Sequence, residues 1–196
     1  MSREDERLKA ALKRYKEAKL HYNELAEKHK VLARQVMLGE YYSVSGLRID
    51  MPFVPSTANK VETMMELIGT LRGKKAADLG CGDGKIVFEM AKRGATVDGY
   101  ELEPRLAGQA RGRLSEASLS ARVIEQNFFT ADLSKYDVIT IYGITSVMKR
   151  LEIKLRQEMK LGSVLVSNTF TLPNWRPERT KNDVYLYRKV ENTEEV

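Results

Sequence analysis

The feature that most constrains the fold is a glycine-rich turn, AADLGCGDGK, at the head of alternating strand-like and helix-like segments. The apolar run Ala76–Leu79 precedes the turn, and the amphipathic segment Lys85–Lys92 follows it. Gly80, Gly82 and Gly84 have no Cβ, so the backbone can turn sharply there and approach a ligand closely. Such a turn lies at the carboxyl end of the first strand, where doubly wound folds bind ligands.

The alternation continues along the chain and predicts an α/β fold, with a parallel sheet wrapped by helices on both faces. The predicted strands are Ala76–Leu79, Thr96–Tyr100, Arg122–Gln126, Val138–Tyr142, Ser163–Ser167 and Val184–Val190. The predicted helices are Thr57–Leu71, which Gly73 ends, Lys85–Lys92, Pro104–Glu116 and Val147–Lys160.

Residues 1–38 are predicted to form a separate segment ahead of a main domain at 39–196. Apolar and aromatic residues recur there at steps of three and four from Leu8 to Val36, without Gly or Pro. This spacing predicts one long charged helix, either a coiled coil or an amphipathic helix that lies on its own domain. Further on, Pro52 and Pro55 favour an extended strap over Met51–Ser56.

Charge and composition restrict the classes of function. The net charge is +6, of which residues 1–38 carry +4, so a nucleic-acid footprint would fall on the N-terminal segment and is not favoured. No stretch approaches the roughly 18 apolar residues that a membrane span needs. The charged start, MSREDER, is unlike a secretory signal. One cysteine, Cys81, and two histidines predict a reducing cytoplasm, no disulfide and no structural metal.

The chemistry of the glycine turn is set by Asp78, two residues before Gly80. A carboxylate there would repel the pyrophosphate of a dinucleotide, and Lys85 occupies the position of the third glycine of the dinucleotide fingerprint. The same carboxylate can orient an ammonium group. The turn therefore suits a nucleoside that carries a zwitterionic amino acid, and S-adenosylmethionine fits that description.

Glu101 follows the second predicted strand, 21 residues after Gly80. An acid at this place can accept hydrogen bonds from both ribose hydroxyls, as the ribose acid of related nucleotide folds does. Glu103 competes for the role. It directly precedes Pro104, so we interpret it as a helix N-terminal charge that the helix dipole favours.

Asn127 lies at the tip of the third predicted strand, directly after Gln126, and can hydrogen-bond the adenine edge. Phe128 or Phe129 can flank the adenine ring, or either can be a core residue. Cys81 has no histidine after residue 29 to act as its base. It is therefore expected to fill the turn within the cofactor loop and not to act as a nucleophile.

Seven segments between residues 53 and 187 carry a resemblance to a known family. They are FVPS (53–56), ADLGCGDGKIV (77–87), GYELEPRL (99–106), YDVITIY (136–142), SVMKRLEIKL (146–155), VSNTF with NW (166–175) and VYLY (184–187). Together they resemble the class I, seven-stranded S-adenosylmethionine-dependent methyltransferases, and most closely the archaeal and mitochondrial protein-lysine methyltransferases.

The resemblance implies a Rossmann-like sheet, S-adenosylmethionine as cofactor, and contacts to it from Phe53, Pro55 and Ser56. Only 28 residues follow Asn168, so we expect neither the extra helix nor the long hairpin of a full class I domain. The apolar anchor of mitochondrial members has no counterpart in the charged first segment. The sequence also departs from the family near Gly143 and Thr145, where the substrate lip is expected to differ.

A lysine must be neutral to attack a methyl group, and its usual pKa is about 10.4. A desolvating aromatic channel would lower that pKa and hold the ammonium form by cation–π contact. Candidates for its wall are Phe53, Tyr142, Phe170 and Trp175, and Asn168 could orient the amine through its carbonyl oxygen. Each of these residues also has an interpretation as a core or strand-end residue.

The sequence thus favours a cytoplasmic protein-lysine N-methyltransferase that acts on exposed lysines of a protein substrate. One alternative is methylation of RNA or a small molecule at the same cofactor site. Another is a non-catalytic, cofactor-binding assembly protein. The N-terminal helix is expected to mediate self-association or docking to a partner.

Overall fold

The computed structural model describes residues 41–42, 48–49, 53–117, 119 and 121–191. The predicted helix within residues 1–38 and the first two residues of the strap lie outside these ranges, so the domain division at residue 38 stays a prediction. Apart from Tyr41, all described residues belong to one compact unit, Tyr42–Val196. No helix in these ranges is long and apolar enough to cross a membrane.

The described elements follow the predicted alternation closely. In chain order they are β1 (Tyr41–Tyr42), β2 (Arg48–Ile49), α2 (Ala58–Ile68), β3 (Lys75–Leu79), α3 (Lys85–Lys92), β4 (Thr96–Glu101), α4 (Pro104–Glu116), β5 (Ala121–Glu125), the 3-10 helix η1 (Phe128–Thr130), β6 (Val138–Ile141), α5 (Thr145–Glu158), β7 (Val164–Asn168), β8 (Arg179–Lys181) and β9 (Val184–Arg188). The bounds of α3 and α4 match the prediction to the residue.

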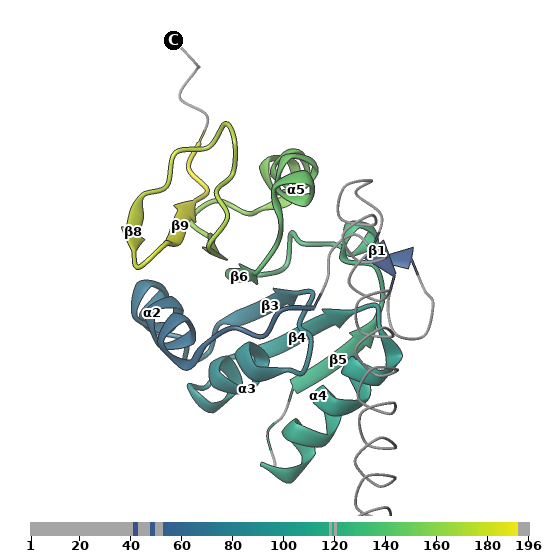
Figure 1. Cartoon of the computed structure of the whole chain (residues 1–196). Coiled ribbons are helices and arrows are strands. Elements are labelled where there is room, and N and C mark those ends of the chain that lie inside the picture. The colour runs from purple at the N-terminus through teal and green to yellow at the C-terminus, as the bar shows by residue number, and fades with distance from the viewer. Residues whose placement is uncertain (1–40, 43–47, 50–52, 118, 120, 192–196) are drawn as a thin grey trace, which may run out of the picture. The chain divides into compact units, whose positions relative to one another are not determined.

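One seven-stranded sheet organises this unit, in the order β5-β4-β3-β6-β7-β9-β8 (Figure 1). The five strands from β5 to β7 are parallel, which confirms the predicted parallel arrangement for these strands. Strand β9 is antiparallel to both β7 and β8, so the whole sheet is mixed. β1 and β2 pair separately.

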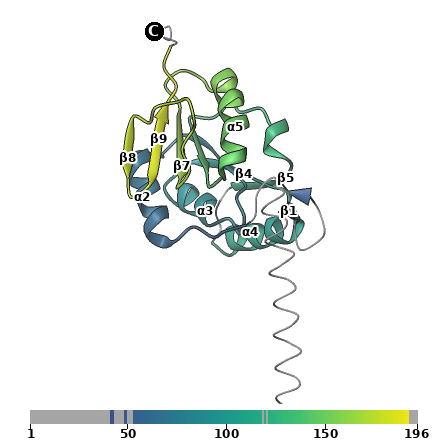
Figure 2. The ribbon, with the colours of Figure 1, turned by 45° about the horizontal axis from the view of Figure 1, so that its top comes forward.

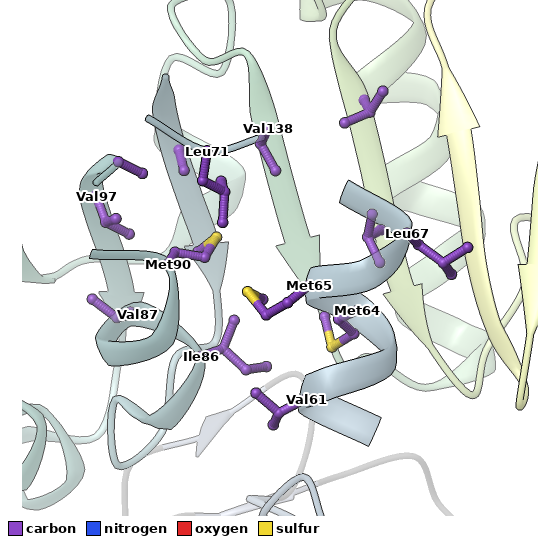
Figure 3. Close-up of a cluster of buried hydrophobic side chains, with 14 of the residues drawn as sticks. Val61, Met64, Met65, Leu67, Leu71, Ile86, Val87, Met90, Val97 and Val138 are labelled. Carbon is purple, nitrogen blue, oxygen red and sulfur yellow. The ribbon is translucent and has the colours of Figure 1, made fainter. Parts of the chain in front are cut away.

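Helices cover both faces of the sheet. In Figure 1, α2, α3 and α4 lie on one side and α5 on the other, and Figure 2 shows β7, β9 and β8 side by side. Successive residues of a strand point to opposite faces. Ala76 therefore joins the core beneath α2 and α3, and Ala77 joins the core beneath α5. In the first core, Met64 and Met65 of α2 and Met90 of α3 belong to one buried cluster, and Met65 points toward Met90 (Figure 3).

Several bounds shift by one or two residues from the sequence prediction, and two differences are larger. Helix α2 ends at Ile68 and not at Leu71, because Gly69 forms its C-cap, with a φ of 77° that favours glycine and an N–H that donates to the Met65 carbonyl. Strand β8 was not predicted. It forms a short hairpin with β9 through Asn182 and Asp183, which both have positive φ, as a type I′ hairpin turn requires.

Candidate functional site

The glycine turn is folded against the carboxyl end of β4. The N–H groups of Gly80 and Cys81 both donate to the Tyr100 carbonyl, each over 2.9 Å. The turn then closes when Gly84 N–H donates to the Cys81 carbonyl over 2.9 Å. Gly80, Gly82 and Gly84 all have positive φ, between 54° and 79°, so the pattern of three glycines follows from the backbone itself.

Gly82 brings three of the predicted residues together. Its N–H donates to Oε2 of Glu101 over 2.8 Å. A Cβ built on Gly82 would lie 2.3 Å from Cε2 of Phe53, so the Phe53 ring covers this glycine. Phe53 is 43% exposed, which leaves much of the ring open to solvent at the edge of the turn.

The Glu101 carboxylate is held by backbone donors on both oxygens. Oε1 accepts from the N–H groups of Leu102 (2.8 Å) and Glu103 (2.9 Å), in addition to the Gly82 bond on Oε2. A carboxylate offers about four acceptor sites, so these bonds leave room for about one more. Glu103 is the N-cap of α4 and its side chain accepts from Arg105 N–H, which confirms that it is a helix N-terminal acid.

Asp78 is a buried acid, 2% exposed, at the end of β3. The Thr140 hydroxyl donates to its Oδ1 over 2.7 Å. Burial raises the pKa of Asp78 to about 7, and the negative charges of Glu101 and Asp83 act in the same direction, against the Thr140 hydrogen bond. A buried carboxyl in an acidic setting favours a cationic ligand, because a cation would stabilise its charged form.

The last residue of the strap, Ser56, is buried and hydrogen-bonded to two other parts of the unit. The Ser56 hydroxyl accepts a hydrogen bond from Nδ2 of Asn168 over 3.1 Å, and its carbonyl accepts one from Nζ of Lys85 over 2.8 Å. Pro55 beside it is exposed. Ser56 thus joins α3, the helix that follows the glycine turn, to the end of β7, two parts of the predicted site.

Asn127 and the two phenylalanines lie at the start of η1. The side-chain oxygen of Asn127 accepts from Phe129 N–H over 2.9 Å, so the NH₂ group is the end of the amide that is left to meet a ligand. Phe128 is buried in the core beneath α5. Phe129 is half-buried, and the Arg150 guanidinium lies 3.5 Å from its ring centroid, so a cation already covers part of this ring.

Cys81 and Gly84 allow close packing between neighbouring elements of the turn region. The Cys81 side chain is buried, and a Cβ on Gly99 would lie 2.8 Å from its Sγ. Burial raises the pKa of this thiol well above its usual value, which keeps it protonated and unreactive. A Cβ on Gly84 would lie 2.7 Å from the Ala110 Cβ, so this glycine allows α3 to approach α4.

The aromatic candidates for the substrate channel fall into two groups. Tyr142 and Phe170 lie at the ends of β6 and β7 with ring centroids 6.3 Å apart. Trp175 instead packs edge-on against Tyr187 at 6.1 Å, with the Arg156 guanidinium 5.0 Å from its ring centroid. The rings of Tyr142 and Phe170 are therefore neighbours, whereas Trp175 packs against Arg156 of α5 and Tyr187 of β9.

Sequence reasoning missed three supporting residues. Thr140 holds Asp78, Lys85 holds the strap, and Arg113 of α4 donates to the carbonyl and carboxylate of Asp83 over 2.9 and 2.7 Å. Of these three residues, only Thr140 could have been found from the sequence, because it lies in a predicted strand beside the glycine turn. Among the described residues, no group of three or more His, Cys, Asp or Glu side chains could hold a metal ion.

The sequence model for the ANTKMT methyltransferase domain matches residues 78–179, more than half of the chain. The chain belongs to this methyltransferase family. The match begins at Asp78 and includes the glycine turn, Glu101, Asn127 and Asn168. The resemblance seen in the sequence is thereby confirmed.

Two relatives are similar over about two thirds of the chain. The adenine nucleotide translocase lysine N-methyltransferase of Mus musculus is 37% identical over 67% of this chain and 58% of its own length. A protein-lysine N-methyltransferase of Saccharolobus islandicus is 30% identical over 70% of this chain and 92% of its own. The chain spans less than two thirds of the length of the mammalian lysine N-methyltransferases that it matches.

One solved structure is similar to a comparable extent. It is an RNA methyltransferase from Salinibacter ruber in complex with S-adenosyl-L-homocysteine. It is 31% identical, with a TM-score of 0.69, and the match covers 73% of this chain and 98% of that one. This likeness confirms the predicted Rossmann-like methyltransferase sheet.

Proposed function

We propose that this protein is an S-adenosylmethionine-dependent protein-lysine N-methyltransferase. The observation that carries the proposal is the match to the Saccharolobus islandicus protein-lysine N-methyltransferase, because it extends over 92% of that relative's length. Membership of the ANTKMT methyltransferase domain family supports the same activity.

The residues around the glycine turn fit the parts of S-adenosylmethionine. The buried Asp78 carboxylate would hold the ammonium group, Glu101 would accept from a ribose hydroxyl, and the Asn127 NH₂ group would donate to the purine edge. Backbone at Gly80 and Gly82 allows close approach. The Phe53 ring, already over Gly82, would cover the bound ligand.

The cofactor supplies an electrophilic methyl group on its sulfonium, so the protein's task is to present the amine. The rings of Tyr142 and Phe170 would line the approach, remove water from the lysine and thereby lower its pKa. The Asn168 carbonyl oxygen would accept an N–H bond from the neutral amine and direct its lone pair toward the methyl group.

A second candidate activity is methylation of RNA. It is favoured by the likeness to the Salinibacter ruber RNA methyltransferase, which is 31% identical to this chain. The +4 charge of residues 1–38 would supply the contacts to phosphate.

For residues 1–38 we propose a long charged helix that acts as a docking arm for self-association or for the protein substrate. The single cysteine supports a cytoplasmic location. Because the glycine turn and Glu101 lie beyond residue 75, removal of residues 1–38 should leave cofactor affinity unchanged and alter oligomeric state or target choice. Sedimentation velocity and target labelling, compared for both lengths of chain, test this proposal; identical results for both would contradict it.

Transfer of a labelled methyl group to cell lysate distinguishes the two activities. We expect label in material that protease removes and nuclease spares. Label that nuclease removes would establish the RNA activity instead. The Asp78→Ala variant serves as the control for contaminating methyltransferases, since loss of a buried charged hydrogen bond should lower cofactor affinity by about ten- to a hundredfold.

A further inference from the structure

Thr169, directly after β7, has a backbone conformation that its side chain disfavours. Its φ is +69°, although threonine is β-branched and its side chain is exposed. A non-glycine residue held in this region typically costs about 1–3 kcal/mol and persists only where the surroundings enforce it. The enforcing bond is from Thr169 N–H to the Asp183 carbonyl, over 2.8 Å, in the turn of the β8–β9 hairpin.

This conformation brings the Thr169 hydroxyl onto its neighbour. In a regular strand, successive side chains point to opposite faces and do not meet. At the end of β7 the alternation is broken, and the Thr169 hydroxyl donates to Oδ1 of Asn168 over 3.0 Å. The strained backbone at Thr169 therefore makes possible one specific contact, between the Thr169 hydroxyl and Asn168.

The amide of Asn168 is consequently held at both ends. Its Nδ2 donates to the Ser56 hydroxyl over 3.1 Å, and its Oδ1 accepts from Thr169. Asn168 is 1% exposed and Ser56 is also buried, whereas Thr169 is exposed. The carbonyl oxygen thus lies next to the exposed Thr169, and its bond to that hydroxyl leaves it one further acceptor position.

We propose that Thr169 is a positioning residue for methyl transfer, which fixes the Asn168 carbonyl oxygen so that it can accept an N–H bond from the substrate amine. This inference rests on the proposed function and adds a residue to it. A hydroxyl at position 169 is required, and the φ of +69° is the conformation that places it beside Asn168.

Three substitutions separate the hydroxyl from the strain. Thr169→Val keeps the shape and the β-branch but removes the hydroxyl, Thr169→Ser keeps the hydroxyl, and Thr169→Gly removes both the hydroxyl and the strain. We expect the rate of methyl transfer to poly-L-lysine, at saturating S-adenosylmethionine, to fall about three- to tenfold in Thr169→Val, as loss of one neutral hydrogen bond predicts. Thr169→Ser should stay within about twofold of the wild type, because it keeps that bond.

Thr169→Gly tests whether the strain serves stability. We expect it to unfold at a temperature no lower than the wild type and yet to transfer methyl groups as slowly as Thr169→Val. Cofactor affinity should be equal in all four proteins. A wild-type rate in Thr169→Val, or a loss in Thr169→Ser as large as that in Thr169→Val, would overturn the proposal.

A measurement without substrate keeps this inference separate from the proposed function. Hydrogen exchange of the Asn168 side-chain NH₂, followed by NMR in the full chain, should be faster in Thr169→Val and near wild type in Thr169→Ser. Unchanged exchange in Thr169→Val would overturn the positioning role. Absence of methyl transfer by the wild type to any lysine, with the exchange pattern as expected, would contradict the proposed function alone.

Discussion

The Thr140 hydroxyl donates a 2.7 Å hydrogen bond to Oδ1 of Asp78, and the two residues are register partners in the parallel pair β3–β6. Thr140 is 0% exposed and Asp78 is 2% exposed, so the bond is shielded from water. It favours the charged form of Asp78, but burial outweighs it and raises the pKa of this acid to about 7. A ligand that carries an ammonium group would supply the missing positive charge.

The first prediction concerns the pH dependence of cofactor affinity. Ammonium binding needs ionised Asp78, so affinity for S-adenosylhomocysteine should rise as the pH increases from about 5.5 to 7, by up to about tenfold per pH unit. Above about pH 8 it should fall, because the ligand's α-amino group loses its proton. Calorimetry over this range tests the claim. An Asp78→Asn variant should bind weakly and lack the rise below pH 7; an equal rise in that variant would contradict the assignment.

The second prediction concerns the ligand-free protein. The folded form holds a proton on Asp78 between about pH 4 and 7, where the unfolded form has released it. This residue therefore makes the free energy of unfolding decrease as the pH rises through that window. Thermal unfolding should show a larger loss of stability from pH 5 to 7 in the wild type than in Asp78→Asn. Equal losses would mean that Asp78 is not buried as a neutral acid.

Substitutions at Glu101 and Glu103 form the third prediction. Glu101→Ala removes the acceptor for three backbone N–H groups as well as for ribose, and Glu101→Gln keeps one acceptor oxygen, so cofactor affinity should fall more in the alanine variant. Glu103→Ala should leave affinity nearly unchanged and lower stability by about 1 kcal/mol through loss of the α4 cap. Calorimetry and thermal unfolding separate the effects. A greater affinity loss in Glu103→Ala would reverse the assignment.

Glycine packing gives the fourth prediction, with a matched control in the same region. Gly84→Ala would place a Cβ 2.7 Å from the Ala110 Cβ and 3.0 Å from its Cα, at a φ of +79°, so stability should fall by about 1–3 kcal/mol. Gly108→Ala lies inside α4 with nothing within 4 Å of the new Cβ. It should raise stability by about 0.5–1 kcal/mol. Denaturant unfolding of both variants gives the two changes in the free energy of unfolding. Equal changes in the two variants would contradict this prediction.

Local chemistry made the cofactor side of the site predictable. Positive φ at Gly80, Gly82 and Gly84 favours glycine, and the proline after Glu103 marks where α4 begins. Both features depend on a few consecutive residues and can therefore be predicted from the sequence. The strand and helix pattern was predictable for the same reason, since buried parallel strands are short apolar runs.

The substrate side depends on contacts between distant residues. Asn168 and Ser56 are 112 positions apart, and no sequence pattern pairs them. Trp175 is predicted to line the channel, and the contacts that set its position, with Tyr187 and Arg156, come from two other elements. The positive φ of Thr169 could not be predicted, because threonine rarely adopts that conformation and because the β8–β9 turn that enforces it was not predicted.

The central claim is that this protein transfers methyl groups to lysine side chains. The most direct test is to label lysate proteins with methyl-labelled S-adenosylmethionine, hydrolyse them in acid and separate the amino acids, with Asp78→Ala as the weakly binding control. We predict label in N-methylated lysines with the wild type, and about ten- to a hundredfold less with the variant when the cofactor concentration is well below its dissociation constant. Label in methylated arginine, in base-labile methyl esters or only in nucleic acid would contradict the account.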